Sequence, residues 1–404
     1  MQKLTLGTVA LTMLLLSVFS PLAARSQSGQ PPAVHGGERK VEQVSIISAA
    51  DGVTLHGSLW LPGGAGLFPA VVLLPDLGAE YPTTYDGALL SSLTDSLVQQ
   101  GVAVLRLDER GTGKSGGTLG QTSLATRLAD VAAALNKLRT HSQVDSARIG
   151  LVGHGRGGNV ALLAGAQPLP PTFIVAIAAS GVSGQETLAA QVPMYGKVFS
   201  TDYDQLERQR QQVTGQMLTR QVAFQMRSKG ASPVQVQAYT DQQASKLQKA
   251  DRKWEAALRK HQHSMLEIVR QMSDNGQARA VLLNMMRQRY PRAPAEELQR
   301  SVQRMTSAGY RDYLMLDPKS RLSAVKCPVL LVQGMADSEV NPTVSLEVLL
   351  KGLNGSAKAS ELRLKDLDHN LRFAAKAATS RDKNLAPVAP GACQEIGRWI
   401  KEVN

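Results

Sequence analysis

The chain alternates between segments with strand-like and helix-like patterns of apolar positions. Residues 41–49 and 53–61 mostly alternate apolar with polar side chains, and Asp51-Gly52 between them is typical of a turn. The two segments are therefore predicted to pair as an antiparallel hairpin. Further strands are predicted, most of them as continuous apolar runs that suit strands covered on both faces. They span residues 69–74, 102–107, 149–152, 171–179, 327–334 and 360–364.

Amphipathic segments with a helical period lie between these strands. Residues 90–100 and 123–138 are predicted helices in the first half of the chain, and residues 342–353 and 395–403 are predicted helices near its end. Strands that alternate with helices along a chain form a mostly parallel sheet with helices on both faces. The pattern therefore predicts an α/β fold.

Residues 184–320 interrupt this alternation. They are rich in Gln, Arg, Lys and Met, and stretches such as 241–270 carry Leu, Met and Val at helical spacing. One apolar stripe per helix is typical of helices that pack on one side and face water on the other. A coiled coil is not indicated, because no heptad pattern persists. We expect a block of helices inserted into the sheet domain.

The first residues of the chain have the pattern of a targeting signal. Lys3 precedes an apolar run that extends to residue 19, and small residues suited to cleavage follow at 23, 24 and 26. Residues 1–26 are therefore predicted to be a secretory signal peptide, and the protein to be secreted or periplasmic, without a stable membrane anchor. Residues 27–40 are rich in Gly, Pro and Ser and are predicted to be a disordered leader.

Composition narrows the classes of partner. The net charge of +12 is concentrated in residues 184–320, which hold 21 Lys and Arg against 13 Asp and Glu. These charges are interspersed, as on a solvated helical surface, and no nucleic-acid-binding motif accompanies them. Aromatic residues make up only 4% of the chain, too few for a stacking platform. We therefore expect no nucleic-acid partner.

Cysteine usage leaves two interpretations open. Cys327 and Cys393 are the two cysteines of the chain. They could pair in an oxidising compartment, or be two small buried side chains. In either case the chain is not a disulfide scaffold.

The candidate chemistry begins where one predicted strand turns directly into a helix. The turn reads Gly153-His154-Gly155-Arg156-Gly157. It resembles the nucleophile elbow of the α/β-hydrolases, G-x-S-x-G, whose central serine attacks the substrate. The central residue of this chain is Gly155, so the motif lacks its reactive hydroxyl.

Two further residues fit the same family. Asp337 follows the strand of residues 327–334, and His369 follows the strand of residues 360–364 in the context Asp-Leu-Asp-His-Asn. The order nucleophile position, acid, base is that of the α/β-hydrolases. The chain is thus similar, over residues 41–404, to secreted bacterial esterases and acyl-peptide hydrolases with a helical cap.

The resemblance implies a domain organisation and an α/β-hydrolase fold. A mostly parallel sheet flanked by helices would carry a helical cap between its sixth and seventh strands. The expected parts are the signal peptide at 1–26, the leader at 27–40, the core at 41–183, the cap at 184–320 and the rest of the core at 321–404.

The resemblance also implies an oxyanion hole formed by two backbone N–H groups. One would come from Arg156, and the other from Leu77 in the loop after the third strand. Asp76 in that loop is a departure from the family, since a carboxylate would oppose a developing oxyanion.

A second glycine-rich segment needs a different interpretation. Residues 108–115 match the D-x-R-G-x-G-x-S segment that follows the fourth strand in many α/β-hydrolases. The spacing of a phosphate-binding loop is not met, because Asp108 stands where its first glycine belongs. We expect a tight structural loop held by Arg110.

Three functional hypotheses follow. Loss of a triad serine costs on the order of 10⁶-fold in turnover, so the protein could be a binding protein that has lost efficient hydrolysis. Alternatively, it could be a working hydrolase of small acyl esters or peptides, using water or another nucleophile with Asp337 and His369. Residue 155 could also be a substitution in an otherwise intact enzyme. The resemblance implies a small acyl ester or peptide-like ligand, no cofactor and no metal; the oligomeric state stays open.

Overall fold

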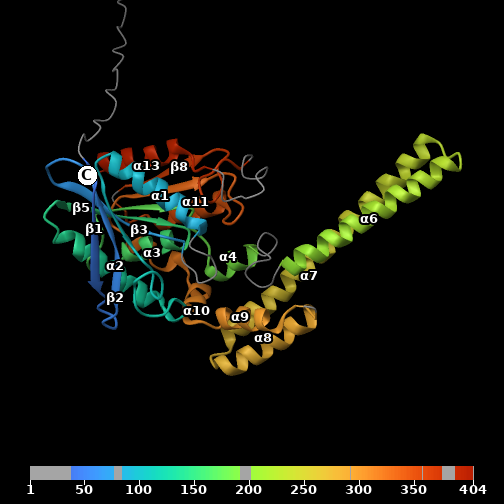
Figure 1. The fold of residues 1–404 in the computed structure, drawn as a ribbon, viewed down its shortest axis with the longest axis horizontal. Helices are drawn as coiled ribbons and strands as arrows, with labels where there is room; N and C mark the ends of the chain where they lie inside the picture. Colours follow the sequence, from blue (N-terminus) through green and yellow to red (C-terminus); the bar gives the residue numbers. More distant parts are fainter. Residues whose placement is uncertain are drawn as a thin grey trace, which may run out of the picture. The chain divides into compact units, whose positions relative to one another are not determined.

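The computed structural model describes residues 38–76, 84–191, 202–291, 293–356, 358–374 and 387–403, all within one compact unit. The predicted signal peptide, most of the predicted leader and Leu77 lie outside these residues. The core is an eight-stranded sheet of order β1-β2-β4-β3-β5-β6-β7-β8 (Figure 1). Its strands are β1 Lys40–Ile47, β2 Thr54–Leu61, β3 Phe68–Leu74, β4 Ala103–Leu107, β5 Val144–His154, β6 Phe173–Ile177, β7 Val329–Gly334 and β8 Ala359–Leu364.

Strand directions agree with the predicted pattern. β1 pairs with β2, and β2 with β4, in antiparallel register. The pairs from β4 through β8 are parallel. The mostly parallel sheet with an N-terminal hairpin is therefore confirmed. β5 begins five residues earlier than predicted, in the polar segment that starts at Val144, which pairs with Phe68 across a register shift.

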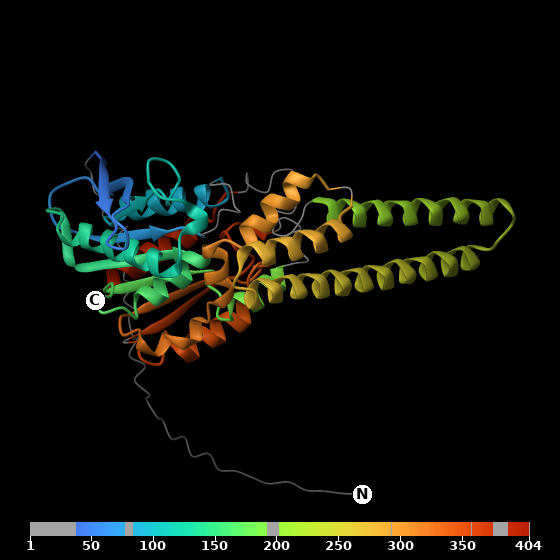
Figure 2. The ribbon, with the colours of Figure 1, turned by 90° about the horizontal axis from the view of Figure 1, so that it is seen from below.

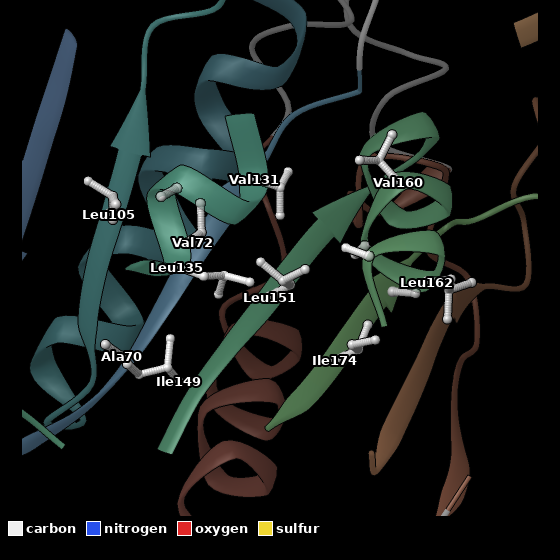
Figure 3. Packing of buried hydrophobic residues seen from close by; sticks show 14 of the residues in the cluster. Ala70, Val72, Leu105, Val131, Leu135, Ile149, Leu151, Val160, Leu162 and Ile174 are labelled. Atoms are coloured by element: carbon white, nitrogen blue, oxygen red, sulfur yellow. The ribbon is translucent and has the colours of Figure 1, made fainter. Parts of the chain in front are cut away.

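Helices cover both faces of the sheet, as predicted. One face carries α2 Leu124–Arg139, α3 Arg156–Ala164 and α11 Pro342–Gly352, whose apolar residues share a buried cluster with the sheet (Figure 3). The other face carries α1 Thr84–Gln99 and α13 Pro390–Glu402 in a second cluster. Neighbouring strand residues alternate between the two clusters: Val72 packs with the first and Val71 with the second.

A helical cap interrupts the sheet between β6 and β7, also as predicted. Its helices are α4 Gly184–Gln191, α6 Asp202–Ser228, α7 Pro233–Gln271, α8 Asn275–Arg289, α9 Ala295–Met305 and α10 Ala308–Met315. They have an apolar cluster of their own, which includes Leu188, Met265, Leu282, Val302 and Leu314. The described residues also form three short 3₁₀ helices, η1 Leu119–Gln121, η2 Pro318–Ser320 and η3 Leu322–Ala324.

Helices α6 and α7 form an antiparallel hairpin. They lie side by side in both views (Figures 1 and 2). Arg208 of α6 pairs with Asp251 and Glu255 of α7, at 3.5 and 2.9 Å. The start of α7 is stabilised by a capping box between Ser232 and Gln235. Side-chain pairs between the two helices, and a well-capped turn, thus hold the hairpin together.

Among the residues described, none of the helices is both long enough and apolar enough to cross a bilayer.

Candidate active site

The predicted elbow is a sharp strand-to-helix turn. β5 ends at His154 and α3 begins at Arg156. Gly155 between them has φ 52° and ψ −119°, a backbone conformation that residues with a side chain rarely adopt. The turn also needs Gly157, since a Cβ there would lie 2.3 Å from the carbonyl oxygen of Pro75. The glycines let α3 start directly against the end of β3.

The carboxylate of Asp76 fills the place of the absent nucleophile. A Cβ on Gly155 would lie 2.5 Å from Asp76 Cγ and 2.6 Å from Asp76 Oδ1. The Arg156 N–H, the expected oxyanion donor, donates to Asp76 Oδ1 at 2.8 Å. Asp76 thus supplies the N-terminal cap for α3 that Gly155 cannot, in the place where an anion is favoured by the helix dipole. The sequence marked Asp76 as a departure but could not place its side chain.

Asp337 and His369 come together at the carboxyl end of the sheet. His369 Nδ1 lies 2.9 Å from Asp337 Oδ2, and the two side chains are 5% and 0% exposed. Asp337 also accepts from Gln333 Nε2 at 2.8 Å and from the backbone N–H groups of Glu339 and Val340 at 2.7 and 3.0 Å. Because an ionised carboxylate only accepts, His369 Nδ1 is the donor in this pair. Asp337 therefore fixes the orientation of the imidazole, as an orienting acid does in a triad.

The other ring nitrogen of His369 points at two more carboxylates. Nε2 lies 3.7 Å from Asp76 Oδ2 and 3.6 Å from Glu339 Oε2. Both separations exceed a hydrogen bond, and this buried atom has no hydrogen-bond partner among the described residues. His154 Nε2 lies 3.0 Å from the His369 carbonyl oxygen, a contact that stabilises the loop carrying His369. Sequence reasoning missed Glu339; its signal was a second carboxylate two positions beyond Asp337.

Charge interactions in this cluster shift three pKa values. Burial by itself would raise the pKa of Asp76, but His369 and the positive charge of Arg156 hold it well below its usual value. Burial likewise opposes protonation of His369, but the charges of Asp337 and Glu339 raise its pKa well above the usual value. Burial raises the pKa of Glu339, and His369 offsets this only in part. The cluster therefore favours positive charge at His369.

Three side chains of this cluster have the composition of a cation site. Ligand atoms of Asp76, Glu339 and His369 all lie within 4.8 Å of one another. Two carboxylates and an imidazole can together coordinate a divalent metal ion.

A cavity of about 450 Å³ opens between the core and the cap, next to the elbow. Five arginines line it, Arg127, Arg156, Arg279, Arg300 and Arg304, against two acidic residues, Glu297 and Asp312. Arg127 pairs with Glu109 at 3.2 Å, and Asp312 accepts the Leu124 N–H at 2.6 Å. Three of the cavity arginines, Arg279 from α8 and Arg300 and Arg304 from α9, have no carboxylate partner within 4 Å in the described part of the chain. The cavity is therefore electropositive.

Arg156 connects this cavity with the elbow. Its guanidinium lies over the ring of Tyr313 from α10, 4.3 Å from the ring centroid. Burial raises the pKa of the Tyr313 hydroxyl, so the ring stays neutral beneath the cation. This stacking joins the first turn of α3 to the cap.

The second glycine-rich segment belongs to the scaffold. The Arg110 guanidinium donates to Asp130 at 2.7 Å and to Asp51 at 2.7 Å. Ser115 Oγ donates to the Asp108 carbonyl oxygen and accepts from the His56 N–H. The expected structural loop held by Arg110 is confirmed, and Ser115 is not a nucleophile at this site.

The structure thus brings together Gly155, Arg156, Asp337 and His369 and adds Asp76 beside them. Leu77, the other expected oxyanion donor, lies outside the described residues. Cys327 and Cys393 are both free. Cys327 packs against the cluster on one face of the sheet and Cys393 within the cluster on the other, so the sheet separates the two thiols.

Comparisons with known proteins agree with this architecture. Among solved structures the chain is similar to Pf2001, an esterase of Pyrococcus furiosus, at 14% identity and a TM-score of 0.50, over 93% of this chain and 95% of that one. It is also similar to DcsB, solved with a substrate analogue, at 15% identity and a TM-score of 0.49, over 90% and 99% of the two chains. Est1E from Butyrivibrio proteoclasticus, solved with ferulic acid, matches at 14% identity and a TM-score of 0.45, over 89% and 99%.

At 14% identity, the similarity to Pf2001 shows the fold alone, which is that of the α/β-hydrolases. A family model described as X-Pro dipeptidyl-peptidase (S15 family) matches residues 51–369. The match extends over well more than half of the chain and includes Gly155, Asp337 and His369. This protein therefore belongs to the X-Pro dipeptidyl-peptidase (S15) family of α/β-hydrolases.

Proposed function

We propose that this protein binds a small acyl or peptide-like ligand between core and cap and does not hydrolyse it through an acyl-enzyme. The observation that carries the proposal is the Asp76 carboxylate, which lies where a serine side chain would be and accepts the Arg156 N–H. An acyl-enzyme needs both a nucleophilic oxygen and donors for the oxyanion. The nucleophilic oxygen is absent at position 155, and the Arg156 donor is already engaged.

The charge of Asp76 adds a further barrier. Two like charges 4 Å apart repel by about 4 kcal/mol at the effective dielectric constant of a protein surface. An oxyanion forming beside Arg156 would meet this repulsion, on top of the ~10⁶-fold cost of the missing serine. Acyl transfer at this elbow would therefore be slower than the loss of the serine alone implies.

The cavity supports a ligand with an acidic group. Arg279, Arg300 and Arg304 face it from the cap, and Arg156 lies at its boundary with the elbow. Guanidinium groups bind carboxylates through paired, charge-assisted hydrogen bonds. The family name favours a peptide-like ligand, whose terminal carboxylate would bind the guanidinium groups of these arginines.

The test combines a serine-directed fluorophosphonate probe with p-nitrophenyl esters and Xaa-Pro-p-nitroanilides. We expect no labelling and no turnover above that of the heat-denatured protein. We also expect mass spectrometry of the purified protein to detect a bound acidic acyl or peptide compound. Rapid labelling, or turnover typical of an esterase, would overturn the proposal.

A second candidate function is hydrolysis by a water molecule with the Asp337–His369 pair as base. The observation in its favour is the buried, oriented imidazole, whose Nε2 has no hydrogen-bond partner among the described residues. His369→Ala is the discriminating variant. Any ester or Xaa-Pro amide cleavage by the native protein must fall at least ~100-fold in this variant, and activity that survives unchanged excludes the mechanism.

We also propose that the mature protein is secreted or periplasmic, on the pattern of residues 1–26. The mass of the protein purified from its native host tests this. We expect a chain that starts near residue 27, and a chain retaining the apolar segment would contradict the proposal.

A further inference from the structure

The Asp337–His369 pair has no serine hydroxyl at the elbow on which to act. A buried, well-oriented acid and base lie in a protein whose elbow offers them no hydroxyl. Two more carboxylates, Asp76 and Glu339, face the same imidazole nitrogen. A triad has one orienting acid for its histidine, so these two additional carboxylates need another explanation.

We propose that Asp76, Glu339 and His369 bind a divalent transition-metal cation in the place where an active relative holds its nucleophilic oxygen. The site is independent of the ligand-binding function proposed above, and each can fail without the other.

The spacing of the three side chains suits a metal ion. A cation with bonds of about 2.1 Å holds tetrahedral ligand atoms about 3.4 Å apart. His369 Nε2 lies 3.7 Å from Asp76 Oδ2 and 3.6 Å from Glu339 Oε2. The ligand atoms of all three side chains lie within 4.8 Å of one another, so side-chain rotations would bring them onto one ion.

The hydrogen bonding of His369 is that of a metal ligand. A histidine that binds a metal through one ring nitrogen commonly donates its other N–H to a carboxylate, which fixes the tautomer. Here Nδ1 donates to Asp337 at 2.9 Å. Nε2 is buried, faces the two carboxylates and lacks a hydrogen-bond partner within the described residues. Asp337 then acts as a positioning residue for the metal ligand, which explains why the pair persists without a serine.

Asp76 is held ready for the same role. Its Oδ1 accepts the Arg156 N–H at 2.8 Å, which turns Oδ2 toward His369. This placement requires that position 155 carry no side chain, because a Cβ there would meet the Asp76 carboxylate. Gly155 and Asp76 are therefore explained together, as a replacement of the hydroxyl by a carboxylate ligand.

The negative charge of the carboxylates around His369 also favours a bound cation. Asp76, Glu339 and Asp337 surround one imidazole, and their side chains are 18%, 12% and 0% exposed. Buried carboxylates are costly unless compensated, and a divalent cation between Asp76 and Glu339 would compensate both. One nitrogen and two oxygen ligands suit Zn²⁺ or Mn²⁺, whereas Mg²⁺ prefers oxygen ligands alone.

The test uses the tag-free, full-length mature protein, freed of metal with EDTA and titrated with Zn²⁺, Mn²⁺ and Mg²⁺ by isothermal calorimetry. We expect one saturable site per chain for Zn²⁺ and Mn²⁺, and weaker binding of Mg²⁺. Bound Co²⁺ should give visible absorption bands that report the nitrogen and oxygen ligands. EDTA-treated and Zn²⁺-loaded samples should differ in melting temperature.

Variants assign the binding to these side chains. Glu339→Gln and His369→Gln should weaken Zn²⁺ binding at least ~100-fold, since each removes a ligand. Asp337→Asn should weaken it about 10–100-fold, the effect expected of a positioning residue. Glu361→Gln is the matched control, because this carboxylate pairs with Arg363 on the surface of β8 and should leave binding unchanged.

The melting temperature of each metal-free variant separates loss of a ligand from loss of the fold. If Glu339→Gln or His369→Gln does not fold, the Co²⁺ spectrum of the Asp337→Asn protein decides, since it should shift from that of the native protein. The proposal is overturned if the native protein shows no saturable binding up to ~1 mM cation, or if the ligand variants that fold bind as the native protein does. Preference for Mg²⁺ over Zn²⁺ would also overturn it.

Discussion

At the scale of single residues, position 155 determines what the site can do. A glycine there removes the nucleophile and leaves room for the Asp76 carboxylate, which then binds the Arg156 N–H. The absence of a side chain at position 155 therefore affects both the nucleophile and the oxyanion donor. A serine restored there would place its Cβ 2.5 Å from Asp76 Cγ, so the Asp76 side chain would have to move.

We predict that Gly155→Ser by itself gives no rapid esterase and lowers stability by about 1–3 kcal/mol, the usual cost of local strain. Combining it with Asp76→Ala should relieve the collision and free the Arg156 donor. p-Nitrophenyl acetate turnover by the double variant should then exceed that of the native protein at least ~100-fold. Asp76→Ala alone is the control; fast turnover by the single Gly155→Ser variant would show that Asp76 does not block the site.

The two thiols are a second prediction at this scale. Burial raises the pKa of both Cys327 and Cys393 to about 11, from a usual value of 9.0. Iodoacetamide should therefore label the native protein far more slowly at pH 8 than the urea-unfolded protein. Because the unfolded thiols ionise first, this contribution to stability is complete below pH 9 and falls as the pH rises toward 11. Rapid labelling of both native thiols at pH 8 would contradict this.

At the scale of elements, the ion pairs of Arg110 connect three segments of the core. It extends from the loop after β4 to Asp51 in the β1–β2 turn and to Asp130 in α2. Its side chain is only 4% exposed. Removing this cation would leave Asp130, whose side chain is 15% exposed, without its charge partner, whereas Asp51 is 45% exposed and stays hydrated.

We therefore predict that Arg110→Ala lowers the free energy of unfolding by about 3–5 kcal/mol in urea titrations. Arg363→Ala is the matched control, since Arg363 pairs with Glu361 on the exposed surface and its loss should leave the free energy of unfolding almost unchanged. Equal effects of the two substitutions would mean that the Arg110 cluster does not stabilise the fold.

At the scale of the whole molecule, the cap has a packed part and a part with little burial. The end of α7 joins α4, α8, α9 and α10 in one apolar cluster. The α6–α7 hairpin instead exposes more than half of several apolar side chains, Val213, Met217, Leu218, Phe224 and Val234. Such residues contribute little to the core, because their apolar area stays in contact with water.

The hairpin should therefore be dispensable for folding. We predict that replacing residues 216–246 with a short Gly-Ser linker from Gly215 to Leu247 changes the melting temperature by only a few degrees. The linker is feasible because these two residues are adjacent across the hairpin. By contrast, Met265→Ala in the cap cluster should cost about 2–5 kcal/mol. Loss of cooperative melting in the shortened protein would show that the hairpin supports the core.

Most of the fold could be predicted from local patterns. Apolar runs predicted the strands and helical periods predicted the helices. This worked because the sheet is covered on both faces and each helix buries one face, so burial repeats with the period of the element. The order Gly155, Asp337, His369 was also visible, since each follows a strand end and parallel strands end at one edge of the sheet. Element ends were less certain: β5 starts in a polar segment that only its pairing with β3 explains.

Glu339 and the position of the Asp76 carboxylate were not visible in the sequence. No local period relates Asp76 to His369, which lie far apart along the chain, and their distance depends on how two loops fold over the sheet. The cavity arginines likewise come from separate helices of the core and cap. By itself the sequence determined the layers of the fold and the absence of a hydroxyl at position 155, because both are written in residue types and their spacing. Only the tertiary structure decided what replaces that hydroxyl, since this depends on side chains brought together through space.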